Sequence, residues 1–116
     1  MTALRTAAVE GLHHASRLVD SFGWEPATSD GPTLHILGHL RAAARSAAAR
    51  HRVRADDLRA LMGYLLATSL ELETPDLFGW EDEPGRTTAD VRAALTSAAH
   101  EAARRAHHTT PAPAAG

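Results

Sequence analysis

The chain has 116 residues, a length that suits one domain with a single core, and its net charge of −2 gives no overall field that would attract nucleic acid or a membrane surface. It contains no cysteine, which excludes disulfides, thiolate metal sites and cysteine nucleophiles. The sequence has neither an apolar run long enough to cross a bilayer nor an N-terminus of the signal-peptide type, so we expect a cytoplasmic protein without membrane contact.

The first predicted element is an amphipathic helix over residues 3–22. Its apolar side chains recur at spacings of three and four, and Gly23 follows directly as a stop signal. Residues 23–32 contain two glycines and two prolines among polar residues, a composition that is typical of a loop.

A second helix is predicted from a cap at Thr33 to about Arg50. The stripe expected to face the core consists of Leu34, Leu37, Ala44 and Ala48. After a break at residues 51–54, residues 55–73 form the most apolar segment, which we expect to be the central helix.

A second loop is predicted over residues 76–86. In Thr87-Thr88-Ala89-Asp90 a hydroxyl precedes a carboxylate by three positions, as in a capping box that opens a helix. A polar tail rich in alanine and proline, residues 107–116, is expected to be disordered. The sequence thus predicts an all-α fold: a compact bundle of four main helices in one domain, residues 1–106, with two Trp-containing loops and a disordered C-terminal tail.

Two copies of the tetrapeptide Phe-Gly-Trp-Glu, at residues 22–25 and 78–81, contain every Trp and Phe of the chain. In an alanine-rich bundle these are the bulkiest side chains, so one interpretation is structural: each glycine ends or bends a helix, and each aromatic pair closes one end of the core. The other is that a Trp stays partly exposed and anchors a partner, since Trp is enriched among interface hot spots. The flanking halves match poorly, which favours chance similarity over duplication.

A resemblance rests on a Gly-Trp pair after the first helix, on residues 37–44 (Leu-Gly-His-Leu-Arg-Ala-Ala-Ala), and on residues 80–87 (Trp-Glu-Asp-Glu-Pro-Gly-Arg-Thr) before the last helix. Over about residues 8–103 the chain resembles a family of small actinobacterial proteins known only as a domain of unknown function. Its members often have Asn after the second Trp and Cys near the start of the second helix, where this chain has Glu81 and His35. The resemblance implies source, size and helical architecture, and it carries no catalytic residue across.

The histidines raise a metal hypothesis. His35 and His39 are four residues apart, a spacing that places two imidazoles on one helical face. Because the predicted core stripe of this helix lies on nearly the opposite side, we expect both side chains at the surface. A third ligand would then have to come from elsewhere on the surface or from another chain. We therefore predict solvated histidines and no bound metal or cofactor.

The alternative functional hypothesis is DNA binding by a helix-turn-helix-like segment, residues 42–66. The arginines that would contact phosphates are Arg45, Arg50, Arg52, Arg54 and Arg59. The turn lacks its usual glycine, and Asp56 and Asp57 would face the groove where a recognition helix reads bases. These two features argue against the hypothesis.

An enzyme is not expected, since the sequence has no Gly-rich phosphate loop, nucleophile elbow or HExxH motif. The acidic run at residues 81–83 is interpreted as a solvated loop or as a partner for a nearby arginine. We predict a small non-enzymatic binding or regulatory module that acts through protein contacts. Its partner is either another protein or a second copy of the chain in a homodimer. The candidate partner-binding residues are Trp24, Trp80 and Arg86.

Overall fold

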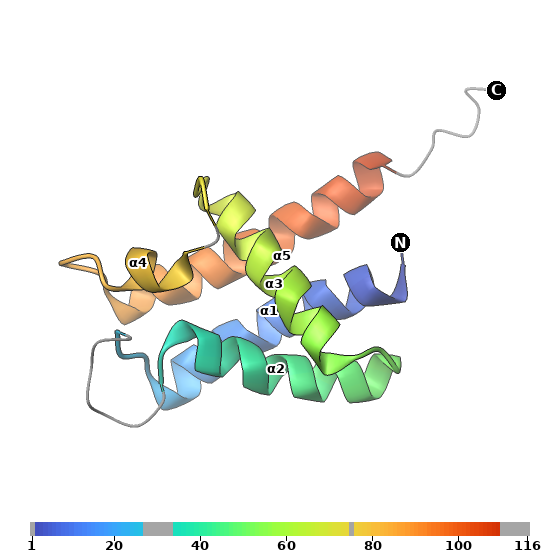
Figure 1. Cartoon of the computed structure of the whole chain (residues 1–116), viewed down its shortest axis with the longest axis horizontal. Helices are drawn as coiled ribbons and strands as arrows, with labels where there is room; N and C mark the ends of the chain where they lie inside the picture. The colour runs from blue at the N-terminus through green and yellow to red at the C-terminus, as the bar shows by residue number, and fades with distance from the viewer. Residues whose placement is uncertain (1, 27–33, 75, 110–116) are drawn as a thin grey trace.

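Every regular element in the described part of the chain is an α-helix (Figure 1). The computed structural model describes residues 2–26, 34–74 and 76–109, with side chains through Arg105. The helices are α1 (Ala3–Phe22), α2 (Ile36–His51), α3 (Ala55–Ser69), α4 (Leu77–Glu81) and α5 (Thr88–Thr109). The predicted all-α fold with four main helices is confirmed. The short helix α4 lies inside the predicted second loop, which is therefore not wholly irregular.

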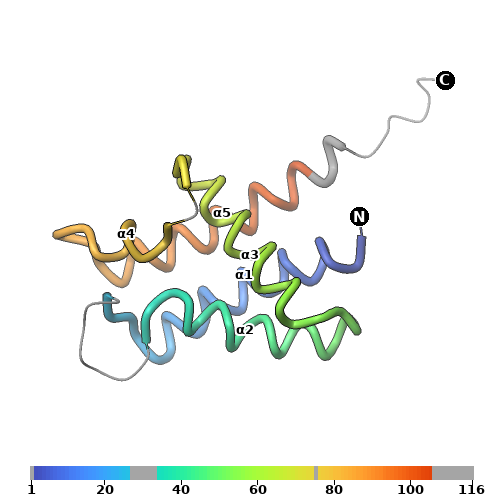
Figure 2. Tube along the Cα trace, in the orientation of Figure 1, coloured from blue at the N-terminus to red at the C-terminus, as the bar shows by residue number. Residues whose placement is uncertain are grey.

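The helices pack around α1. Helices α2 and α5 run antiparallel to it, and α3 lies across all three (Figures 1 and 2). Alanines line the buried faces of α1, α2 and α5, so these helices approach closely, while α3 contributes larger leucine and methionine side chains. Helix α1 packs more extensively than α3, which the sequence predicts as the central helix. No helix within the described residues combines the length and apolarity needed to cross a bilayer.

Gly11 lies where α1 meets α3. A Cβ added at Gly11 would lie 2.7 Å from Sδ of the fully buried Met62, whereas one added at Gly63 would meet nothing closer than 4.0 Å. Both glycines are inside helices, so replacement by Ala gains about 1 kcal/mol of helix propensity at either site. We expect Gly63→Ala to raise the free energy of unfolding by about 0.5–1 kcal/mol. Gly11→Ala should be less stable than Gly63→Ala, because the end of the flexible but fully buried Met62 side chain must shift to make room. Urea unfolding of both variants measures this difference, and equal stabilities would contradict the tight packing.

Helix α3 ends one turn before the predicted end at residue 73. The amide of Leu72 donates to the carbonyl of Ala67 and that of Glu71 to the carbonyl of Thr68, both at 3.0 Å. Glu71 is left-handed, with φ of 57°. This pair of bonds closes the helix in the geometry that usually uses glycine. The sequence has no glycine at this position, and the helix end was therefore not predictable from local signals.

The buried face of α2 differs from the predicted stripe. Leu34 and Leu37 are only half-buried. The buried residues are Ile36, His39, Leu40, Ala43, Ala44, Ala47 and Ala48. Helix α2 is thus rotated so that Leu40, rather than Leu37, points into the core. The predicted cap Thr33 lies outside the described residues, and α2 begins after His35.

The start of α5 confirms the predicted capping box. The amide of Asp90 donates to Thr87 Oγ1 at 3.1 Å, and the amide of Thr87 donates to Asp90 Oδ2 at 3.0 Å. Two exposed N–H groups at the helix start are thereby paired. Helix α5 continues to Thr109, so residues 107–109, predicted as the start of the tail, are helical. The rest of the predicted tail lies outside the described residues.

Candidate partner-binding site

The two Phe-Gly-Trp-Glu segments meet at the end of the bundle where α1 ends and α2 and α5 begin (Figure 1). Trp24 Nε1 donates a hydrogen bond of 3.0 Å to Glu81 Oε2, and the amide of Ile36 donates to the same oxygen at 2.8 Å. Ile36 is the first residue of α2, whose initial amides have no partner within the helix. One carboxylate therefore joins the segment after α1, the start of α2 and the end of α4.

Glu81 is buried, with 1% of its surface exposed. Burial raises the pKa of its carboxyl group, and the hydrogen bonds from Trp24 and Ile36 oppose that rise. Its second oxygen, Oε1, has no hydrogen-bond partner within the described residues. The acidic run at residues 81–83 is thus not a uniformly solvated loop, because its first member is a structural cap inside the protein.

Trp80 and Arg86 form a stacked pair at the surface. The guanidinium carbon of Arg86 lies 3.9 Å from the centroid of the Trp80 ring. Arg86 Nε donates to the Trp80 carbonyl at 3.0 Å, and Nη2 donates to Glu83 Oε2 at 3.2 Å. A cation over an indole face is attracted by the ring quadrupole. Together with the two hydrogen bonds, this contact fixes the orientation of the half-buried Trp80 side chain.

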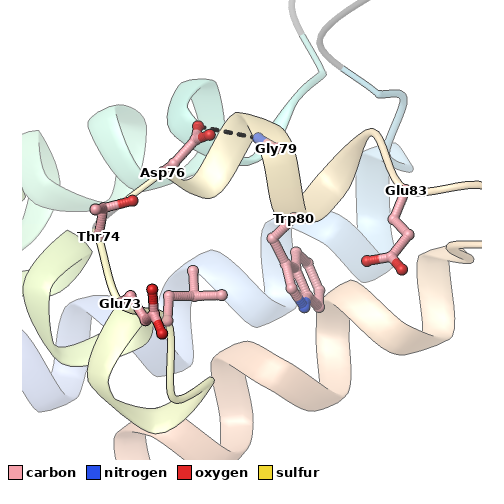
Figure 3. A pocket seen from close by; sticks show the side chains of 7 residues that line it. Glu73, Thr74, Asp76, Gly79, Trp80 and Glu83 are labelled. Carbon is pink, nitrogen blue, oxygen red and sulfur yellow. Dashed lines mark hydrogen bonds between the residues drawn. The ribbon is translucent and has the colours of Figure 1, made fainter.

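Two concave surfaces flank Trp80. The first, which we call the Trp80 pocket, has a volume of about 390 Å³. It is lined by Leu72, Glu73, Thr74, Asp76, Gly79, Trp80 and Glu83. Figure 3 shows the indole directed away from α4, between Glu73 on one side and Glu83 on the other. The second surface, of about 360 Å³, lies between the end of α3 and the first turns of α5, and Trp80 and Arg86 line it as well.

The Phe side chains do not close the core as the structural interpretation predicts. Phe22 is 66% exposed and Phe78 is 41% exposed, whereas both tryptophans are half-buried against the core. The reason is local in both cases. Phe22 is the last residue of α1 and lies on its outer face. Helix α4 buries Leu77 and Glu81 and is capped by the bond from Gly79 N to Asp76 Oδ1 at 3.0 Å, and this orientation leaves Phe78 outside. The tryptophans alone pack against the end of the core.

The histidine prediction is wrong for His39 and partly wrong for His35. His39 is buried, and its Nε2 lies 2.8 Å from the carbonyl oxygen of Gly23. It therefore holds the segment that follows α1 against α2. His35 is half-buried and makes an edge-to-face contact with Phe78, with ring centroids 5.9 Å apart. The described residues contain no group of three or more side chains that could hold a metal ion.

A family model for a family of unknown function, DUF6197, matches residues 2–101. The chain belongs to family DUF6197. The match extends from the N-cap of α1 into α5 and includes both tetrapeptides and the Trp80 pocket. No curated protein and no solved structure matches this DUF6197 chain. The family has no assigned activity, and the roles of its residues follow from their geometry.

The five arginines of the DNA-binding hypothesis have different surroundings in the DUF6197 structure. Arg50 pairs with Glu10 at 2.9 Å and donates to Ser46 Oγ at 3.1 Å, and Arg54 lies 3.9 Å from Asp57. Arg52 is exposed in the turn after α2. Arg45 and Arg59 line one pocket between α2 and α3. Two of the five side chains thus have carboxylate partners within the chain, and two others line a shared pocket.

Sequence reasoning did not predict the roles of Glu81 and His39. The usable signal for Glu81 is its place in the second tetrapeptide, since the copy after α1 ends in the same residue. For His39 the signal is spacing, because it lies three residues after Ile36 and four before Ala43, both buried. A correct register for α2 would have placed His39 on the inner face.

Proposed function

We propose that this DUF6197 protein is a small non-enzymatic module that binds another protein at the Trp80 pocket. The observation that carries the proposal is the half-buried Trp80 ring, held by Arg86 and lining two concave surfaces. Tryptophan and arginine are enriched among hot spots, and a side chain already fixed in orientation loses little entropy on binding. Trp24 supports the site through its hydrogen bond to Glu81, the residue that follows Trp80.

The charge of the Trp80 pocket indicates the chemistry of the partner. Its acidic members are Glu73, Asp76 and Glu83. Asp76 accepts from the amide of Gly79 and Glu83 from Arg86, while Glu73 has no bonded partner within the described residues. We infer that the partner presents a basic segment, because complementary charge guides encounter and fixes register at interfaces. A second copy of the chain is the alternative partner.

DNA binding through residues 42–66 stays an alternative, supported by the exposed Arg45 and Arg52 and opposed by Asp56 and Asp57, which are exposed in the first turn of α3. An actinobacterial source and a cytoplasmic location remain predictions from the sequence.

The partner-binding proposal predicts a crosslink at the Trp80 pocket. A photoreactive residue at position 73, introduced in cells of the source organism, should capture a specific protein, whereas the same residue at the exposed position 64 should not. Trp80→Ala should weaken binding of the captured protein about 30-fold or more, as for a hot-spot residue. Glu73→Arg should also weaken binding by reversing the charge. Tyr64→Ala removes an exposed aromatic ring outside the pocket and serves as the matched control.

The proposal is refuted if Trp80→Ala binds the captured protein as tightly as wild type does and circular dichroism shows that both proteins are folded. Capture of a second copy of the chain, with a mass that doubles in light scattering, would identify the homodimer as the functional form.

A further inference from the structure

A second charged site lies between α2 and α3. We call it the arginine pocket; it has a volume of about 270 Å³. It is lined by Arg41, Ala44, Arg45, Ala55, Asp56 and Arg59. Arg41 and Arg45 are one turn apart on α2, and Arg59 comes from α3. Because Ala44 and Ala55 have short side chains, they leave the pocket unfilled.

The arginine pocket carries uncompensated positive charge. Three arginines and one aspartate line it, which gives a formal charge of +3 − 1 = +2. Arg41, Arg45 and Arg59 have no ion pair within the described residues, whereas Arg50, Arg86 and Arg92 each pair with a carboxylate. Like charges four residues apart on a helix destabilise it slightly. Binding an anion between them would relieve this repulsion.

The geometry points to a phosphoryl group as the ligand, and we propose that the arginine pocket binds one. The planar guanidinium group donates two parallel hydrogen bonds to phosphate oxygens, and three such groups on two helices can surround one anion. The pocket is too small for a large ligand, but a phosphate or diphosphate fits this volume. Asp56 would repel a fully ionised anion and can accept a hydrogen bond from a hydroxyl on the ligand, which favours a phosphate ester that carries one.

This site is independent of the proposed protein-binding function. It shares no lining residue with the Trp80 pocket. Two kinds of ligand carry such a phosphoryl group: a small phosphorylated molecule and the backbone of a nucleic acid. The second source corresponds to the DNA-binding alternative, but it uses Arg41, Arg45 and Arg59 instead of a recognition helix.

The test is calorimetric titration at low ionic strength with pyrophosphate, inorganic phosphate and a short mixed-sequence DNA duplex. Arg45→Ala and Arg59→Ala should each weaken pyrophosphate binding about tenfold or more, as for loss of a charge-assisted hydrogen bond. Arg104→Ala, which removes an exposed arginine of α5, is the matched control and should bind like wild type. Asp56→Asn should strengthen binding. Amide resonances of residues 41–59 should shift on addition of pyrophosphate.

The two sources give different results. A duplex that binds far more tightly than pyrophosphate, and loses affinity in the same two variants, assigns the pocket to a nucleic-acid backbone. Tighter binding of pyrophosphate assigns it to a small phosphorylated ligand. The proposal is overturned if none of the three probes binds. It is also overturned if Arg104→Ala lowers affinity as much as Arg45→Ala, since binding would then reflect general charge. Neither result depends on whether a protein partner binds the Trp80 pocket.

Discussion

Glu81→Ala is expected to lower the free energy of unfolding by about 2–4 kcal/mol, because two donors lose their shared acceptor. These donors are Trp24 Nε1 and the amide of Ile36. Alanine leaves both without a partner at a site that water reaches poorly, since Glu81 is 1% exposed. The segment after α1, the start of α2 and α4 would lose their common contact. Urea unfolding followed by tryptophan fluorescence measures the change.

Glu81→Gln is the matched control and separates hydrogen bonding from charge. Glutamine keeps an acceptor oxygen and removes the ionisable group, so its stability near neutral pH should lie within about 1 kcal/mol of wild type. A loss as large as that of the alanine variant would show that the negative charge, rather than the acceptor, holds the site together.

The difference in stability between wild type and Glu81→Gln should depend on pH. Burial raises the pKa of Glu81 above its ordinary value, so the folded state binds this proton more tightly than the unfolded state. The contribution of Glu81 to stability is therefore fully present below the ordinary pKa of a glutamate and is lost as pH rises through the raised pKa. The stability of wild type relative to Glu81→Gln should fall over this window.

Comparison with Glu81→Gln is needed because Glu10 acts in the opposite direction. His51 and Arg50 lower the pKa of Glu10, so its contribution is present above its ordinary pKa and is lost as pH falls through the lowered pKa. Glu10 is retained in both proteins, and its effect cancels in the difference. A constant difference across this pH range would contradict the raised pKa of Glu81.

Leu40→Ala is expected to destabilise the protein by about 2–5 kcal/mol, the usual range for a buried leucine. Leu40 is fully buried on the inner face of α2, against a core whose other members there are largely alanines. Because alanines have no side-chain length with which to fill a cavity, the site should collapse poorly. Urea unfolding measures the loss.

Leu37→Ala is the control, since it makes the same change three residues earlier on the same helix. Leu37 is half-buried, so its loss should cost about 1–1.5 kcal/mol, in proportion to the apolar surface it covers. The stripe predicted from the sequence requires the reverse order, with Leu37 the costlier site. This pair of variants thus tests the register of α2 directly.

The helical pattern could be predicted because it depends on local properties of the chain. The apolar spacing over residues 3–22, the stop at Gly23 and the Thr87–Asp90 box each act within one or two helical turns, and the structure agrees with all three. The early end of α3 and the short helix α4 were missed because they depend on a left-handed glutamate and on burial of Leu77.

An all-α chain with four main helices follows from the sequence alone, because periodicity and caps are encoded by neighbouring residues. Tertiary packing, in contrast, sets the rotation of α2 and with it the burial of His39. It also decided that Glu81 would meet Trp24 across 57 positions of sequence. Such contacts depend on how whole helices pack, since packing fixes which polar groups lose water and must find partners within the protein.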